Sequence, residues 1–345
     1  ARVQSMFADL SDPEPPRERQ EFRLALEHER AYVIATDPEA SRSSMSLLAK
    51  REDPQDRTFG EGRDTLIRRL ARSIATERLG ERSLQPDAGF LRAGVGQSRW
   101  NPDQAGDSLS IGFDEGKALD ALRGAWTEIR RLQLHGALQD ELDRAKQGVL
   151  EQYRRLESDL ENQPSTKLAD ELVRHALDQE PVMGMAAEIE ATRRALATIE
   201  LADLEPVFAT LVRSDAEVFS LLLSESDQPL PTPEQVQAVL EQVDASEPPP
   251  LTGAATLAAL VDTVPPKGAV ESVDHRFEAL GFTGWTFGNG IRVWFKDTDF
   301  KEDEIRLSGW IEGGHGSVDD ERWNDARSAD SIIGWSGIGE HGVEA

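Results

Sequence analysis

The stretch Thr283-Gly-Trp-Thr-Phe-Gly-Asn-Gly-Ile-Arg-Val-Trp-Phe-Lys296 is the most informative part of the 345-residue chain. Two short runs of aromatic and β-branched residues flank Asn289-Gly290, and an Asn-Gly pair tolerates the positive φ that a tight hairpin needs. The stretch therefore predicts a strand, a two-residue turn and a second strand.

Further elements are predicted downstream of this hairpin. The sequence indicates a third strand through Leu307 and Trp310, a Gly313-Gly314 turn, and a helix that holds Asp325-Ala-Arg-Ser-Ala-Asp-Ser-Ile-Ile333. This βββα order, with Thr298-Asp-Phe-Lys301 after the hairpin, resembles the start of a repeat in the insulinase/pitrilysin family of zinc metallopeptidases. An unrelated βββα domain that opens with a hairpin is the alternative.

The helix of this predicted repeat decides its chemistry. In the family, the helix of a catalytic repeat carries H-x-x-E-H, in which two histidines hold Zn²⁺ and the glutamate activates water. The same frame here gives Arg327, Asp330 and Ser331. Arg327 is a permanent cation and cannot ligate a metal, and Ser331 is a poor ligand. Asp330 has no activated water to serve, so we expect no catalytic residue and no metal ligand in this degenerate motif.

Composition restricts the classes of partner. A formal net charge of −26 and a pI near 4.6 argue against a nucleic-acid surface and against docking on an anionic membrane. High net charge chiefly aids solubility, so attraction of basic peptides is the weaker interpretation. The chain has no cysteine, which excludes disulfides, thiolate nucleophiles and iron–sulfur clusters.

The sequence shows no membrane segment or signal peptide. No apolar run approaches the roughly 20 residues that span a bilayer, so we expect no membrane insertion. The chain begins at Ala1 rather than Met, and it stops within what resembles a domain opening. We therefore expect it to be a piece of a longer protein.

The region before the hairpin predicts an α+β domain. Short β-rich runs occur at 31–36, 45–50, 90–100, 108–113 and 217–223, and helical periodicity occurs at 65–79, 117–134, 140–160, 164–178, 186–196 and from 201. Gly80 is predicted to end the first helix, Asp114 to cap the second, and Pro206 to occupy a first turn. This order predicts an antiparallel sheet under a layer of helices.

Proline marks the connecting segments. Asp12-Pro-Glu-Pro-Pro16 predicts an extended entry linker. Gln228-Pro-Leu-Pro-Thr-Pro233 and Glu247-Pro-Pro-Pro250 flank a short helical piece at 234–243, and Pro265-Pro266 follows. Proline at this density is typical of a semi-rigid connector.

The resemblance to the peptidase family extends over nearly the whole chain. It implies an entry linker at 1–20, a second, non-catalytic α+β domain at 21–226, a Pro-rich hinge between two halves at 227–281, and the start of a third, inactive domain at 282–345. It also implies a peptide substrate, contact with the remaining domains of the parent chain, and a location in the periplasm or cell envelope. Zinc would be bound by the parent protein and not by this chain.

Other candidates for chemistry have simpler interpretations. His28, His135, His175, His275, His315 and His341 lack a second ligand at helical spacing, and we expect His175 to pair with Glu171. Gly94-Val-Gly96 and Ser336-Gly-Ile-Gly339 lack the context of a phosphate loop or a nucleophile elbow. Paired arginines at 68–69, 130–131, 154–155 and 193–194 are expected to form ion pairs with the abundant glutamates.

Three functions are compatible with the sequence. The first is the non-catalytic chamber wall and hinge of a zinc-dependent metalloendopeptidase. The second is a catalytically dead partner subunit or scaffold, which an H-x-x-E-H upstream in the parent protein would exclude. The third is an unrelated acidic helical module, which predicts no two-domain α+β layout.

Overall fold

The computed structural model describes residues 2–9, 11, 20, 22–40, 42–53, 55–158, 165–178, 181–225, 229–251, 263, 266–298 and 305–334. These residues fall into two units. The first comprises 1–137, 174–181 and 199–249, and the second comprises 138–173, 182–198 and 250–345. The predicted linker at 12–16, His341 and the Ser336–Gly339 segment lie outside the described residues.

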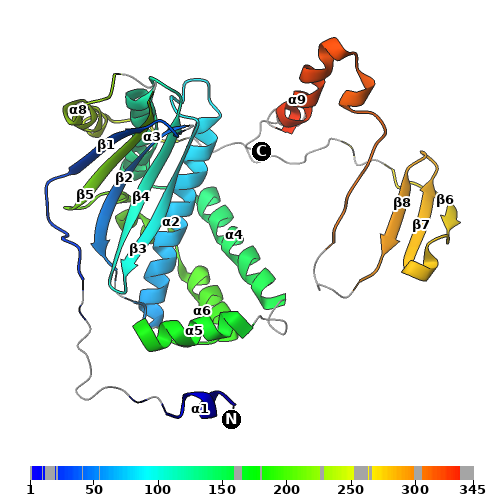
Figure 1. Ribbon diagram of the computed structural model, residues 1–345, viewed down its shortest axis with the longest axis horizontal. Helices are drawn as coiled ribbons and strands as arrows, with labels where there is room; N and C mark the ends of the chain where they lie inside the picture. Colours follow the sequence, from blue (N-terminus) through cyan, green and yellow to red (C-terminus); the bar gives the residue numbers. More distant parts are fainter. Residues whose placement is uncertain are drawn as a thin grey trace. The chain divides into compact units, whose positions relative to one another are not determined.

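A five-stranded sheet forms the centre of the first unit (Figure 1). Its strands are β1 (Ala31–Asp37), β2 (Ser43–Glu52), β3 (Arg92–Asn101), β4 (Gln104–Phe113) and β5 (Glu217–Ser224), in the order β1-β5-β2-β4-β3. The α+β class is confirmed. One pair departs from the predicted antiparallel arrangement, because β1 runs parallel to β5.

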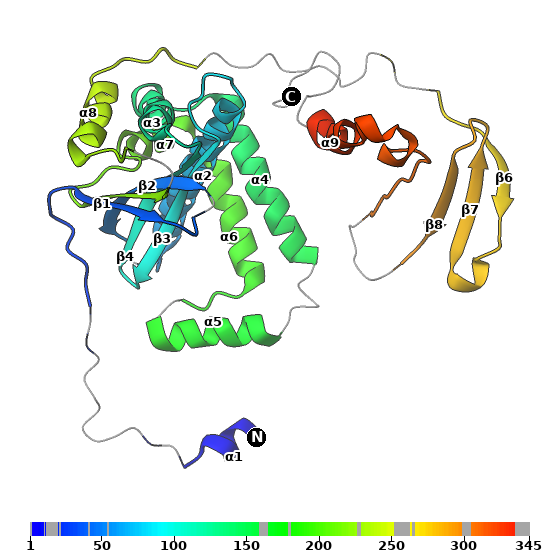
Figure 2. The same ribbon diagram turned by 45° about the horizontal axis from the view of Figure 1, so that its top comes forward.

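The sheet buries one of its two faces. Along β2 the side chains alternate between buried and half-buried, as a strand with one covered face requires. Met45, Leu47, Leu109, Phe219 and Leu221 point into the core and are at most 4% exposed. Helices α2 (Phe59–Ser83) and α3 (Ala118–His135) cover this side (Figure 2). We call the other side, formed by the alternate residues of the same strands, the open face.

Helix α2 is longer than its predicted extent. It begins at a capping box in which Thr58 accepts a hydrogen bond from the Glu61 backbone N–H and Glu61 accepts one from the Thr58 backbone N–H. Hydrogen bonds from the Arg57 and Thr58 backbones hold the pKa of Glu61 below its usual value. The predicted stop at Gly80 is wrong, because Gly80 lies inside the helix with open space around it and the helix continues to Ser83.

Two other predicted helix details differ from the structure. The N-cap of α3 is Lys117, not Asp114, whose backbone carbonyl accepts a hydrogen bond from the Lys117 N–H in the turn before the helix. Helix α7 (Leu201–Ala209) begins with Glu200 as N-cap, so Pro206 is interior and not in the first turn. A short helix tolerates the one backbone hydrogen bond that an interior proline removes.

A helix within the predicted hinge packs on the first unit. Helix α8 (Pro233–Asp244) buries Val236, Val239, Leu240 and Val243 and lies against α3. The Trp126 indole N–H donates to Asp244 Oδ1 at 2.9 Å, and the Arg213 guanidinium stacks 4.4 Å from the Trp126 ring and pairs with the same carboxylate. Trp126 is fully buried, so α8 is joined to the core by packing and by a shared carboxylate.

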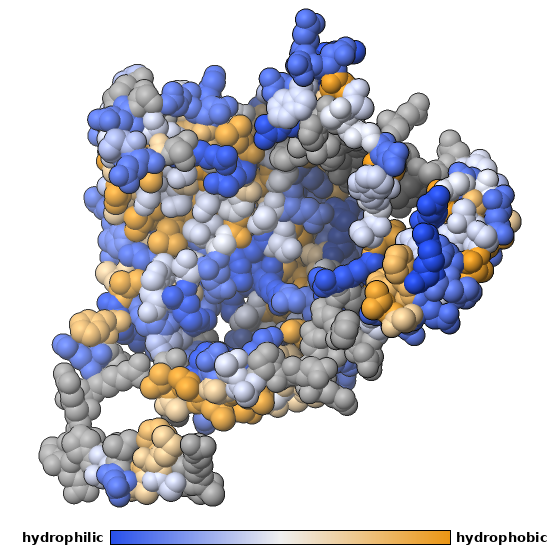
Figure 3. Space-filling view, turned by 45° about the vertical axis from the view of Figure 1, so that its right-hand side comes forward, coloured by the Kyte–Doolittle hydropathy of each residue, from blue (hydrophilic) through white to orange (hydrophobic). Residues whose placement is uncertain are grey.

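The second unit contains several helices. Helices α4 (Gln139–Ser158) and α6 (Met185–Thr198) pack together through a Tyr153–Glu188 hydrogen bond of 2.9 Å and an Arg193–Glu157 ion pair. Helix α5 (Ser165–Asp178) crosses the division between the units and exposes its apolar residues, Leu168, Leu172, Val173 and Leu177. Figure 3 shows apolar side chains gathered in several patches on the surface that faces the viewer. The short helix α1 (Arg2–Phe7) belongs to the first unit.

A three-stranded sheet forms around the predicted hairpin. Strands β7 (Phe282–Phe287) and β8 (Arg292–Lys296) pair as expected, and Gly290 has φ +85° in the turn. The predicted third strand through Leu307 and Trp310 is wrong, because residues 305–311 are exposed and form no strand with any described segment. The outer strand is instead β6 (Val270–Asp274), which comes from the predicted hinge and pairs with β7.

Candidate functional site

The degenerate motif lies on a helix, as predicted. Helix α9 (Trp323–Gly334) spans Arg327, Asp330 and Ser331, at the i, i+3 and i+4 positions of the motif. Arg327 is exposed, and its guanidinium lies 5.3 Å from the centre of the Trp323 ring. A guanidinium has no lone pair to give a metal, so this donor set does not fit zinc.

The histidines have local partners. His28 Nδ1 lies 2.7 Å from the Glu29 carbonyl oxygen, and His135 Nε2 lies 2.8 Å from that of Pro248. His275 is 3.6 Å from Glu278, one turn away. Within the described residues, no three His, Asp or Glu side chains gather as a metal site would require. The expected His175–Glu171 pair stays a prediction.

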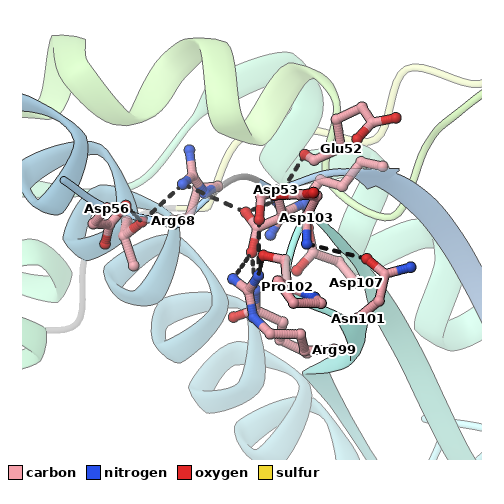
Figure 4. A network of polar contacts seen from close by, with 12 residues as sticks. Glu52, Asp53, Asp56, Arg68, Arg99, Asn101, Pro102, Asp103 and Asp107 are labelled. Atoms are coloured by element: carbon pink, nitrogen blue, oxygen red, sulfur yellow. Dashed lines mark hydrogen bonds and ion pairs between the residues drawn. The ribbon is translucent and has the colours of Figure 1, made fainter. Parts of the chain in front are cut away.

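A dense polar network joins α2 to the end of the sheet (Figure 4). Asp53 is 3% exposed and pairs with Arg51 and Arg99, and the Arg68 guanidinium lies 3.6 Å from it. Asp107 accepts from Arg51 at 3.3 Å and from Arg72 at 3.1 Å. The network therefore connects β2, β3, β4 and α2 through two carboxylates.

The electrostatics of this network are those of a structural clamp. Burial lowers the pKa of Arg72, Asp107 opposes this, and the neighbouring charge of Arg51 lowers the pKa further. Burial raises the pKa of the adjacent Asp56, against a hydrogen bond from Thr65 and the charge of Arg68. Both network carboxylates are held by guanidinium groups, so neither is free to act as a general base.

Two of the arginines for which ion pairs were predicted contact buried carboxylates. Arg68 pairs with Asp53, and Arg131 pairs with the buried Glu128. Arg154 and Arg193 pair with Glu151 and Glu157 on the helices of the second unit. The expected ion pairs with glutamate are confirmed for Arg131, Arg154 and Arg193, whereas the partner of Arg68 is an aspartate.

The open face of the five-stranded sheet is the strongest candidate for a binding surface. Its central row crosses all five strands, because Val33 pairs with Ser220, Ser220 with Ser46, Ser46 with Ser110 and Ser110 with Gly94. Small side chains in such a row leave the backbone near the surface. A trough of about 700 Å³ lies here, lined by Val33, Ser46, Gly94, Ser110, Gly112 and Ser220 among others.

Larger side chains lie toward the two ends of the open face. The Arg92 side chain lies over Gly112, where an added Cβ would come within 3.0 Å of the arginine Nε. At the other end the Trp100 ring lies over Gly106, where a Cβ would come within 2.6 Å of the ring and 2.8 Å of the Ala49 carbonyl oxygen. Glycine at these two positions is therefore required for the bordering side chains to lie flat on the sheet.

Two neighbouring segments close the margins of the open face. The Leu24 backbone N–H and C=O both bond the Gln104 side chain, at 2.8 and 3.0 Å, which fixes the approach segment at one end of the strands. On the β3 edge, Thr76 of α2 bonds the N–H and C=O of Val95. A further strand therefore cannot add to β3 at Val95 without displacing Thr76.

A second hollow, of about 890 Å³, lies beside the start of β1 and β5. It contains Glu217, which is buried and pairs with Arg30. The Gln237 amide oxygen accepts from Arg30 and, at 2.8 Å, from the Tyr32 hydroxyl. Its central polar groups thus bond one another, which is typical of a structural contact between α8 and the strands.

Sequence analysis missed the open face. Its signal is the alternation Ser44-Met45-Ser46-Leu47 in β2 together with Ser108, Ser110 and Ser220 in its neighbours. The alternation predicts a strand with one covered face, but only the strand order places the serines in one row. The network around Asp53 was missed for the same reason, since its members come from three strands and a helix.

Comparisons with known proteins place this fold. No family model matches the chain. A zinc protease PQQL-like protein of Arabidopsis thaliana is 20% identical over 356 residues, which cover 97% of this chain and 32% of that protein. The chain therefore spans about a third of the length of this curated relative.

Solved structures agree. The periplasmic protease PqqL from Escherichia coli matches with a TM-score of 0.67 and 15% identity, over 98% of this chain and 38% of that one. A predicted insulinase family protease from Yersinia pestis matches with a TM-score of 0.60 and 13% identity, over 71% and 52% of the two chains. The chain thus has the fold of part of an insulinase-family (M16) peptidase, and the predicted resemblance is confirmed.

Proposed function

We propose that the chain is the non-catalytic chamber-wall and hinge portion of a longer zinc-dependent metalloendopeptidase. The observation that carries this proposal is the similarity of nearly the whole chain to about a third of a zinc protease, with matching fold. In this assignment residues 21–226 form a second, non-catalytic domain, 227–281 the hinge between two halves, and 282–345 the start of a third, inactive domain.

Peptide hydrolysis would take place on other domains of that protein. Zinc bound there would activate the attacking water, whereas Arg327, Asp330 and Ser331 offer no suitable donor set. The contribution of this chain is to enclose and orient the peptide. The open face, with its hydroxyl row and bordering Arg92 and Trp100, offers the surface for that contact.

Helix α8 lies within the proposed hinge but packs on the preceding domain. Because Trp126 and Arg213 both hold Asp244, the N-terminal part of the proposed hinge is fixed to the preceding domain. Strand β6, near the other end of the hinge, is fixed to β7. The proposed hinge therefore has its first helix packed on the preceding domain and its last strand paired within the following one.

We also propose that the protein works in the periplasm or cell envelope. A solved structural neighbour is described as a periplasmic protease, and the chain contains no cysteine that an oxidising compartment would affect. None of the helices in the described residues combines the length and the apolar character needed to cross a membrane.

Zinc content and peptide cleavage test this proposal. The purified chain is expected to bind no stoichiometric zinc and to cleave no peptide in a quenched-fluorescence assay. The longer protein that contains it is expected to carry about one zinc per chain and to lose cleavage when a chelator is added. Stoichiometric zinc with chelator-sensitive cleavage in the isolated chain would contradict the assignment. A longer protein without an H-x-x-E-H motif would instead be a dead partner subunit.

A further inference from the structure

The open face combines cations and hydroxyls that have no partners in the described part of the chain. Arg92 and Lys50 both project from this face, one on β3 and one on β2. Neither side chain forms an ion pair or hydrogen bond with any described residue, although the chain has 64 Asp and Glu against 38 Lys and Arg. Two unpaired cations on one surface of so acidic a protein are informative, because most arginines described above have a carboxylate partner.

The hydroxyls of the open face are also free. Ser220, Ser46 and Ser110 lie side by side on three adjacent strands, and Ser44 and Ser108 lie in the rows next to them. No residue in the described part of the chain hydrogen-bonds any of these five hydroxyls. Each hydroxyl can donate one hydrogen bond and accept others, so together they match the alternating polar groups of a polypeptide backbone.

The central rows of this face contain no carboxylate. The rows read Ala35-Leu222-Ser44-Gly112-Arg92, Val33-Ser220-Ser46-Ser110-Gly94 and Ala31-Val218-Leu48-Ser108-Gly96. Lys50 occupies the next row, opposite Gly106. An acidic ligand would therefore meet Arg92 in the trough and Lys50 one row beyond the three central rows, and none of these three rows places a like charge beneath it.

We propose that the open face binds an extended, acidic polypeptide segment, with one carboxylate at Arg92, another at Lys50 and the backbone over the serine row. The charge complementarity favours a ligand with carboxylates over a basic or neutral one. This inference adds a substrate class to the proposed chamber wall. It concerns binding by this chain itself, so it can fail while the proposed peptidase role holds.

The strand register predicts the spacing of the two carboxylates. Arg92 on β3 lies in the same row as Ser44 on β2, and Lys50 lies six residues after Ser44 along β2. Strand β4 lies between β2 and β3, so the two cations are also two strands apart. With a rise of about 3.3 Å per residue and about 4.8 Å between strands, the two Cα positions are roughly 22 Å apart. An extended peptide covers this distance in about six to seven residues, and only residues an even number apart point to the same side. Acidic residues at i and i+6 therefore fit.

Binding of synthetic peptides to the full chain tests this proposal. The probe is a capped twelve-residue peptide of Ser, Thr and Ala with glutamates at i and i+6, and binding is measured by isothermal titration calorimetry. We expect it to bind at least tenfold more tightly than its glutamine counterpart. A peptide of equal composition with glutamates at i and i+7 is expected to bind more weakly, because one carboxylate then points away from the sheet.

Variants of the chain identify the surface. Arg92→Gln and Lys50→Gln are each expected to weaken binding about fivefold, and together about 25-fold, since well-separated sites act additively. Arg57→Gln removes an equal charge ahead of α2 and should leave binding unchanged. Ser110→Tyr keeps every charge but fills the trough, and it should abolish binding. Thermal unfolding checks that each variant is folded.

Several results would overturn the proposal. These are equal affinity for the glutamate and glutamine peptides, a double variant that binds like the unmodified chain, tighter binding of a lysine peptide, and no binding at millimolar peptide. Equal, Arg92-dependent binding of a single-stranded oligonucleotide would identify a general anion surface and reject the polypeptide. None of these results bears on zinc content or cleavage in the longer protein, which test the proposed function separately.

Discussion

Asp53→Ala is expected to lower the free energy of unfolding of the first unit by about 3–5 kcal/mol, the usual loss when one partner of a buried ion pair is removed. Asp53 is buried between Arg51, Arg68 and Arg99, and it also accepts a hydrogen bond from Gln97 at 3.2 Å. Its removal leaves three guanidinium groups close together around one uncompensated site. Urea unfolding followed by circular dichroism measures the loss.

The matched control for Asp53→Ala is Asp103→Ala. Asp103 is exposed, and its hydrogen bonds to other described residues run through its backbone, whose C=O accepts from the Asp53 N–H and whose N–H donates to Asn101 Oδ1. Its substitution is expected to change the stability by no more than about 0.5 kcal/mol. Similar midpoints for the two variants would show that the network around Asp53 contributes little to the fold.

Trp126→Ala is expected to cost about 3–5 kcal/mol, the range for removing a large aromatic side chain from a core. Trp126 is fully buried, supplies a hydrogen bond to Asp244 and forms the surface on which Arg213 stacks. Because these contacts join α8 to α3, the amide groups of α8 should also lose protection. Hydrogen exchange of residues 233–244, together with urea unfolding, measures both effects.

Two further variants separate the parts of this effect. Trp126→Phe keeps most of the packing but loses the hydrogen bond to Asp244. The loss of this bond should lower the free energy of unfolding by about 1 kcal/mol, in addition to the cost of the smaller ring. Trp310→Ala removes the same side chain at a position that is 82% exposed, and its effect should stay within about 0.5 kcal/mol. Unchanged exchange in α8 after Trp126→Ala would contradict the fixed attachment of the hinge segment.

Local pattern predicted the elements better than their partners. Alternating residues in β2 and β4 and the 3.6-residue period of α3 were sufficient to place these elements, because one face of each is buried. The parallel pairing of β1 with β5 joins residues almost two hundred positions apart, and no local pattern specifies it. The same holds for β6, which replaced the predicted third strand beside the hairpin.

Helix ends and polar contacts were the least predictable features. Glycine is typical of a helix end, but α2 continues past Gly80 to Ser83. The backbone groups of this last turn still form hydrogen bonds within the helix. The open face and the Asp53 network depend on the strand register, which brings Asp107 level with Gln97 and Ser46 level with Ser220. Their residue types are visible in the sequence, but their proximity is not.

The proposed chamber wall also explains why the two surfaces of the sheet differ. The covered face contributes the core, and the polar network at its end fixes α2 to three strands. The open face has small residues, together with hydroxyls and two cations that have no partner among the described residues. A purely structural sheet face of this kind would gain stability from larger side chains, so its smoothness is consistent with contact to a second polypeptide.

Site-specific photo-cross-linking in the longer protein tests this account most directly. Benzoylphenylalanine at position 35, at the β1 margin of the trough, places the probe beside the serine row without filling it, and the same probe at position 123 of α3 places it on the helical side of the unit. During incubation with a peptide substrate, we expect a cross-link to form at 35 and not at 123. Equal cross-linking at both positions, or none at 35 while the peptide is being cleaved, would contradict the assignment of the open face as a chamber wall.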